Sequence, residues 1–140
     1  MNAGHMATRA RRPTTGAKRR VALWGPVAVY MLAIFILSAQ SDVPLPKGMT
    51  DKQGHSLGYL GFGITVTRAC IGGLGAPVSL SQGLGAIALA VAYGASDEWH
   101  QSFVPGRTAD IADLRADAAG AFLGTAACWL WGIIRSRSIT

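Results

Sequence analysis

The sequence has few charged residues: Asp, Glu, Lys and Arg make up 14% of its 140 residues, whereas 50% of the residues are hydrophobic. A soluble domain carries about 25% charged residues, so this chain has too little charge to cover a surface that faces only water. The shortage predicts that much of the surface faces lipid. The 18 glycines agree with this prediction, because Gly is more frequent in membrane helices than in soluble ones.

Cysteine is scarce as well, since Cys70 and Cys128 are the only two in the chain. Both fall within apolar segments, and two isolated cysteines provide neither a disulfide framework nor the ligand spacing of a zinc site. We therefore interpret them as small buried hydrophobic residues. The signature His-Glu-x-x-His is also absent, so this metalloprotease motif does not indicate an enzyme.

Acidic residues are missing from the first twenty positions, which hold six of the thirteen Lys and Arg residues. A basic tail of this kind is compatible with nucleic-acid binding. Beside a long apolar run, however, it is better interpreted as a topology signal that stays in the cytoplasm. We predict that residues 1–20 form a disordered basic cytoplasmic tail and that nucleic acid is not a partner.

Apolar stretches predict four transmembrane helices, at about residues 21–40, 55–74, 81–99 and 115–134. The first stretch has no charge from Val21 to Ala39, and at 1.5 Å per residue it reaches about 28 Å, close to the thickness of a hydrocarbon core. A cleaved signal peptide has the same order of basic, apolar and small residues. The further spans favour an uncleaved helix. Arg68 interrupts the second span near its inner end, where a long side chain can reach the interface.

The basic residues also predict the orientation of the chain. With four spans and a cytoplasmic N-terminus, nine Lys and Arg residues lie inside and four lie outside, which obeys the positive-inside rule. The predicted fold class is therefore an all-α membrane protein, a four-helix transmembrane bundle with cytoplasmic N- and C-termini. Its membrane domain covers residues 21–134, and a basic C-terminal tail covers residues 135–140.

This topology places every carboxylate at the outer end of the bundle, together with His55 and His100. Small residues at helical spacing, which let membrane helices pack closely, lead toward these polar groups. The stripes are Gly54, Gly58 and Gly61; Ala86, Ala90 and Gly94; and Gly120 and Gly124. Residues three or four apart share a helix face, and polar groups near lipid tend to face the bundle interior. We therefore predict one shared polar site at the outer end.

The polar residues form a pattern that resembles the VanZ-like family, bacterial membrane proteins named for a member associated with teicoplanin resistance. The resemblance extends from about residue 25 to 130 and rests on the motifs Asp51-Lys52-x-x-His55-x-x-x-Tyr59, Asp97-Glu98-x-His100-Gln101-x-Phe103-x-Pro105-Gly106-Arg107, Asp110-x-x-Asp113 and Gly120. One position departs from the pattern, because Asp117 stands where many members carry Asn. The resemblance implies a multi-pass protein of the bacterial cytoplasmic (inner) membrane and a resistance phenotype, but it implies no reaction.

The interpretation we favour is a non-catalytic envelope factor linked to glycopeptide (teicoplanin-type) resistance. Its outer cluster would bind an anionic or peptide-bearing envelope precursor, or the glycopeptide itself. The predicted ligand-binding residues are Lys52, His55, Tyr59, Asp97, Glu98, His100, Gln101, Arg107, Asp110 and Asp113. Lys52 and Arg107 would contact phosphate or carboxylate groups, for which the guanidinium has a bidentate geometry.

Two other interpretations remain open. In the first, the protein is an enzyme acting on a lipid or cell-wall precursor, with catalytic candidates His55, His100, Asp97 and Glu98. One of the histidines would then be the general base, oriented by a carboxylate. In the second, the cations only neutralise carboxylates and hold the helix ends together. A metal bound by both histidines and a carboxylate is chemically possible, but the spacing does not support it, so we predict no metal and no cofactor. The oligomeric state is open.

The topology can be tested with single cysteine reporters in the three connecting loops. We expect labelling from outside at Gly48 and Gly106 and from inside at Gly75. The chain crosses the membrane twice between positions 48 and 106, so these two positions lie on the same side. Accessibility to a membrane-impermeant thiol reagent measures this. Labels at positions 48 and 106 that react from opposite sides would rule out a shared polar site.

Overall fold

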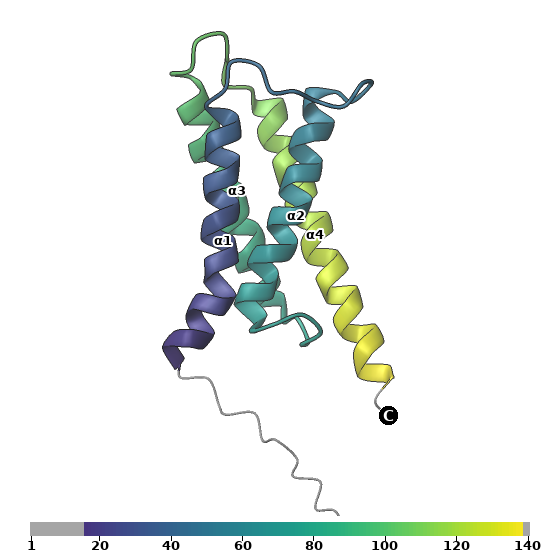
Figure 1. The fold of residues 1–140 in the computed structure, drawn as a ribbon. Helices are drawn as coiled ribbons and strands as arrows, with labels where there is room; N and C mark the ends of the chain where they lie inside the picture. Colours follow the sequence, from purple (N-terminus) through teal and green to yellow (C-terminus); the bar gives the residue numbers. More distant parts are fainter. Residues whose placement is uncertain (1–15, 139–140) are drawn as a thin grey trace, which may run out of the picture.

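The computed structural model describes residues 16–138, which form four α-helices and no strand (Figure 1). They are α1 (Gly16–Ser38), α2 (Asp51–Ile71), α3 (Leu80–Gln101) and α4 (Ile111–Arg137). The helices run alternately up and down, so the loops 39–50 and 102–110 meet at one end of the bundle. The 72–79 loop lies at the other end, with the start of α1 and the end of α4. The predicted all-helical class is confirmed.

The helices extend beyond several of the predicted boundaries. Helix α1 begins at Gly16, so the described part of the stretch predicted as a disordered tail is helical; residues 1–15 lie outside the description. Helix α2 begins earlier than predicted because Thr50 and Gln53 form a capping box, in which each side chain bonds to the other residue's backbone N–H. Hydropathy alone misses such polar first turns.

Two helices, α1 and α4, are long and apolar enough to cross a membrane, judged by length and composition. Both expose large apolar side chains, including Val29, Leu32 and Ile36 on α1 and Phe122 and Leu130 on α4. Contiguous apolar surface of this kind is unusual on a water-soluble monomer. These features indicate a membrane protein. Helices α2 and α3 do not pass the same test of length and composition.

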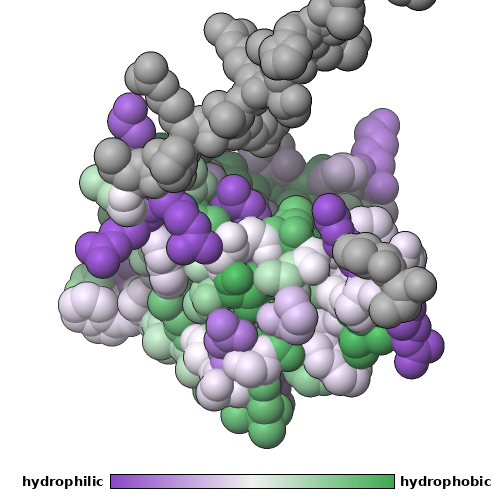
Figure 2. All heavy atoms as spheres, turned by 90° about the horizontal axis from the view of Figure 1, so that it is seen from below, coloured by the Kyte–Doolittle hydropathy of each residue, from purple (hydrophilic) through white to green (hydrophobic). Residues whose placement is uncertain are grey.

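The two ends of the bundle differ in charge. Figure 2 views the end where α1 begins and α4 ends, and hydrophilic side chains lie at several points of its outline. The described basic residues of these helix ends are Lys18, Arg19, Arg20, Arg68, Arg135 and Arg137. All seven carboxylates of the sequence lie elsewhere, in the other half of the bundle or its loops. The predicted separation of basic and acidic residues is therefore present in the fold.

Arg68 donates hydrogen bonds to a backbone carbonyl of α1 that has no donor within the helix. Pro26 lies inside that helix and has no N–H to donate to the carbonyl of Ala22, four residues earlier. The Nη1 and Nη2 atoms of Arg68 lie 3.3 Å from this carbonyl oxygen and donate to it instead. An unbonded carbonyl is costly in an apolar environment. Arg68 therefore has a structural partner on α1.

Helices α2 and α4 approach until their backbones touch. A Cβ atom on Gly120 or Gly124 would overlap the carbonyl oxygen of Ser56 or Leu60, respectively. One on Gly63 would lie 2.6 Å from the carbonyl oxygen of Ala121. The predicted stripe on α4 therefore packs as expected for small residues in membrane helices.

The predicted stripe on α2 has a different role. Gly61 lies against the Tyr30 hydroxyl of α1, Gly54 lies against Leu45, and Gly58 has open space around it. Gly63 makes the glycine contact with α4, although the predicted stripe did not include it. On α3 the prediction is confirmed for Ala86 and Ala90, which have no exposed surface.

The reporter positions 48, 75 and 106 are glycines with φ of 87°, 88° and 81°. A cysteine is strained at such φ values. The exposed neighbours Lys47, Leu74 and Ala109 are better sites, and they sample the same three loops.

The contact between α2 and α4 predicts a stability effect. Gly124→Ala should lower the free energy of unfolding by about 1–3 kcal/mol, because the added methyl group forces the two backbones apart. Gly85→Ala is the matched control, since a Cβ there meets nothing within 4 Å, and it should be neutral or slightly stabilising. Thermal unfolding in detergent measures both. Equal melting temperatures for the two variants would contradict this packing.

Candidate functional site

Three helices bring their polar residues together at the end where loops 39–50 and 102–110 meet. Helix α2 contributes Asp51, His55 and Tyr59, which are four residues apart and share one face. Helix α4 begins at its N-cap Asp110, whose side chain accepts from the Ala112 N–H. Two further α4 carboxylates and three polar residues at the end of α3 are buried: Asp113, Asp117, Asp97, Glu98 and Gln101. The structure therefore places these polar residues close together at one end of the bundle.

His55 and Asp117 form the central pair of this cluster. The imidazole Nδ1 lies 2.9 Å from Asp117 Oδ1, and the exposed fractions of the two side chains are 12% and 1%. The second oxygen, Oδ2, faces Gly94 of α3, where an added Cβ would lie 3.0 Å away. It has no hydrogen-bond partner among the described residues. Asp117 was not among the predicted ligand-binding residues, although its helical spacing from Gly120 and its departure from the family pattern both marked it.

Lys52 joins the first turns of α2 and α4. Its ammonium group lies 2.9 Å from Asp110 Oδ2 and 2.8 Å from Asp113 Oδ1. The Ala112 N–H and then the Lys52 ammonium lower the pKa of Asp110 below its ordinary value, since both favour the ionised carboxylate. Lys52 is therefore neutralised within the protein.

Asp97 and Gln101 connect α3 to α1 and to Arg107. The Ser38 hydroxyl at the end of α1 donates to Asp97 Oδ1 at 2.6 Å, and the Gln101 amide donates to Oδ2 at 3.1 Å. Arg107 donates from Nη2 and Nε to the Gln101 carbonyl oxygen, at 2.6 and 3.2 Å. Sequence reasoning missed Ser38, because a single serine at the end of an apolar helix gives no pattern.

Glu98 and Tyr59 complete the inner part of the cluster. Glu98 Oε2 accepts the backbone N–H of Asp110 at 2.8 Å, which ties the end of α3 to the start of α4. Tyr59 has an exposed fraction of 2%, and its hydroxyl has no hydrogen-bond partner among the described residues. Its ring edge lies beside Gly94, as does Asp117 Oδ2.

His100 lies apart from His55. Its ring stacks on Phe35 of α1 with a centroid distance of 4.3 Å. Among the described residues it belongs to neither of the two clusters of potential metal ligands that include His55. The structure therefore brings together most of the predicted site but does not pair the two histidines.

Two hollows open beside the cluster. An apolar cavity of about 160 Å³ lies between α1, α2 and the 39–50 loop, with Ile34, Leu37, Gly58 and Tyr59 in its wall. A polar hollow of about 430 Å³ adjoins it, lined by residues that include Lys52, Thr108 and Asp110. The two hollows share Val43, Leu45, Asp51, Gln101 and Arg107. An apolar group and a polar group of one ligand can therefore lie in adjacent spaces.

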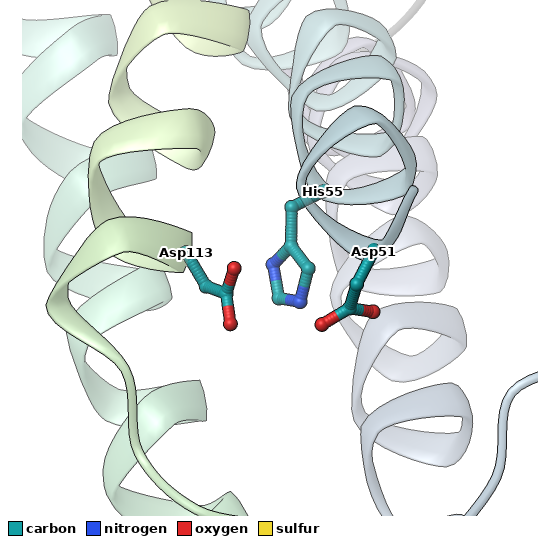
Figure 3. Close-up of side chains that lie close together, drawn as sticks. All are labelled: Asp51, His55 and Asp113. Atoms are coloured by element: carbon teal, nitrogen blue, oxygen red, sulfur yellow. The ribbon is translucent and has the colours of Figure 1, made fainter. Parts of the chain in front are cut away.

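His55 belongs to two sets of potential metal ligands. Figure 3 shows its imidazole between the carboxylates of Asp51, on the same helix, and Asp113 of α4. The second set consists of His55, Glu98 and Asp117. Within each set the ligand atoms lie within 4.8 Å of one another.

Comparison with known families agrees with the position of these residues. The model of the VanZ/LLP1 family matches residues 12–132, which include α1, α2, α3 and most of α4. The chain belongs to the VanZ/LLP1 family. No curated protein and no solved structure matches it. Membership of VanZ/LLP1 agrees with the resemblance of the sequence motifs and makes a link to antibiotic resistance plausible.

The contact between α1 and α3 predicts the effect of a substitution. Ser38→Ala removes the donor to Asp97 Oδ1 and should lower the free energy of unfolding by about 1–3 kcal/mol, because a buried carboxylate oxygen loses its partner. Ser41→Ala, in the exposed loop that follows, is the control and should change little. Denaturation in detergent measures the difference. If the two substitutions have the same effect, Ser38 does not support the buried carboxylate.

Proposed function

We propose that this VanZ/LLP1 protein crosses the bacterial cytoplasmic membrane four times and binds an amphiphilic cell-envelope molecule at its outer end. In this role it would reduce the action of glycopeptide antibiotics of the teicoplanin type. Six of the ten described Lys and Arg residues lie at the end opposite the carboxylates, which supports this orientation, since cytoplasmic ends carry the excess of Lys and Arg. Both ends of the chain would then be cytoplasmic.

The observation that carries the proposal is the junction of the apolar cavity with the polar hollow at Arg107. A lipid-linked precursor, or a glycopeptide with an apolar substituent, has an apolar chain and a polar head. The chain would lie between α1 and α2, where Gly58 leaves open space. The head would lie over the 102–110 loop. Apolar pockets with a few convergent polar groups are typical of small-molecule sites.

Arg107 is better placed than Lys52 to contact an anionic head group. Lys52 already bonds two carboxylates. Arg107 bonds only the neutral amide of Gln101 among its described contacts, so its guanidinium keeps its charge uncompensated. A guanidinium presents a planar fork that suits carboxylate and phosphate. We therefore assign recognition of the acidic group to Arg107, with Gln101 holding it in position.

A second candidate, the enzyme, is favoured by the His55–Asp117 pair. A histidine that bonds a buried carboxylate through Nδ1 is the arrangement of a general base with its orienting group. His55 lines the apolar cavity, so its ring can reach a bound molecule. The reaction would be acid–base chemistry on a lipid or cell-wall precursor.

A growth assay separates the binding function from the enzymatic one. A susceptible host is grown under teicoplanin-type challenge, and the amount of the protein in the membrane is measured in parallel. We expect Arg107→Gln and Gly58→Leu to reduce tolerance several-fold at a normal protein level, because one removes the anion contact and the other fills the apolar cavity. The matched controls are Arg115→Gln, at an exposed position of α4, and Gly85→Leu, whose Cβ also meets open space. Both controls should keep full tolerance.

Other outcomes identify the other functions. Loss of tolerance on His55→Gln with full tolerance on Arg107→Gln would support the enzyme. A fall in protein level for all site variants would show that the cluster is structural. Equal growth of cells with and without the protein would overturn the link to resistance.

A further inference from the structure

The buried carboxylates of the cluster exceed the cations that face them. Asp97, Glu98, Asp113 and Asp117 have exposed fractions between 1% and 6%. In this cluster the ion pairs with Lys or Arg are those of Lys52, which reach Asp113 and the more exposed Asp110. Within the described part of the chain, Asp97, Glu98 and Asp117 have no Lys or Arg partner within 4.0 Å. Among the described residues, the one side chain that bonds any of these three carboxylates and can carry a positive charge is His55, and only when it is protonated.

An excess of buried negative charge is energetically unfavourable away from water. A buried carboxylate without a cation either becomes protonated or needs a bound positive ion. Neutral donors satisfy Asp97, from Ser38 and Gln101. Asp117 differs, because its Oδ2 is fully buried and has no partner. This oxygen is the specific feature that an additional group would satisfy.

We propose that His55, Glu98 and Asp117 bind a divalent transition-metal ion, with zinc the preferred ion. The three side chains come from α2, α3 and α4, and their ligand atoms lie within 4.8 Å of one another. Two ligands on one zinc ion lie about 3.4 Å apart at tetrahedral angles. The His55 Nδ1 to Asp117 Oδ1 distance of 2.9 Å is close to that value, and Glu98, within 4.8 Å of both, would have to move toward the ion.

The donor set indicates which ion binds. One imidazole nitrogen with two carboxylates suits zinc or manganese, whereas magnesium and calcium prefer oxygen ligands alone. Zinc binds such a site more tightly than manganese. Its charge would offset the carboxylates. Glu98 is already fixed through Oε2, which accepts the Asp110 N–H, and a bound backbone donor of this kind orients a ligand.

The other set is less suitable for a metal. Asp113 already accepts a hydrogen bond from Lys52, and Asp51 is exposed. A cation bound by Asp51, His55 and Asp113 would have to compete with the Lys52 ammonium group. The inner set of His55, Glu98 and Asp117 has no such competitor, because among the described residues Lys52 pairs only with Asp110 and Asp113. The apolar cavity lined by Asp51 and His55 gives a path from the outer end to the imidazole. This inference goes beyond the proposed function, because metal binding is measured without the envelope ligand.

Zinc titration of the purified full chain in detergent, after stripping with a chelator, tests the proposal. We expect one zinc ion per chain, and Asp117→Asn and Glu98→Gln should each weaken binding about tenfold or more. Asp42→Asn, an exposed loop carboxylate, is the matched control and should bind like the unchanged chain. Equal weakening by Asp42→Asn, or no zinc binding by the unchanged chain, would overturn the proposal.

Thermal unfolding with and without zinc separates metal binding from a failure to fold. Asp117→Asn keeps the oxygen that bonds His55 and removes a buried charge, so the zinc-free variant should melt no lower than the zinc-free unchanged chain. Zinc should raise the melting temperature of the unchanged chain and leave that of the variant unchanged. If Asp51→Asn abolishes the zinc effect while Asp117→Asn retains it, the outer set is the site and the assignment is wrong.

Discussion

The close approach of α2 and α4 is the constraint on which the site depends. Gly120 and Gly124 have no side chain to separate the helices, so their backbones lie against the carbonyl oxygens of Ser56 and Leu60. About one helical turn from Gly120, nearer the start of α4, the same contact sets His55 beside Asp117 at 2.9 Å. Lipid offers little hydrophobic drive for association of membrane helices, so van der Waals contact and interhelical hydrogen bonds hold such helices together. The packing and the polar pair are therefore parts of one interface.

Buried carboxylates make this interface energetically unfavourable at the end where loops 39–50 and 102–110 meet. The packing of three helices buries four carboxylates within a few turns, and burying one without a compensating charge costs several kcal/mol. Lys52 and neutral donors satisfy Asp113 and Asp97. A fold that evolved only for stability has no need of the remaining acidic groups, because amides or apolar residues would fill the same space at lower cost. Buried ionisable groups in a membrane-protein bundle are a reason to look for a function.

The sequence predicted the parts of the site that follow from helical spacing. Asp51, His55 and Tyr59 share a face because they are four residues apart, and the Gly120–Gly124 stripe had a clear consequence for packing. Spacing could not show which helix each face meets. Gly61 therefore faces Tyr30 of α1, and Gly63, absent from the predicted stripe, meets α4. The rotation of each helix depends on all its neighbours at once, and one sequence does not reveal it.

Two further features depend on contacts between distant positions. Ser38 and Asp97 are 59 residues apart, and no local pattern links a serine at a helix end to a carboxylate on another helix. Asp117 is the second feature that the sequence alone could not explain. An asparagine there would accept the His55 N–H through one atom and carry its own donor on the other, without any charge. Aspartate keeps the first bond but leaves Oδ2 unpartnered against Gly94. The chain thus carries an ionisable group that its own packing does not require, which is the physical reason to look for a bound cation.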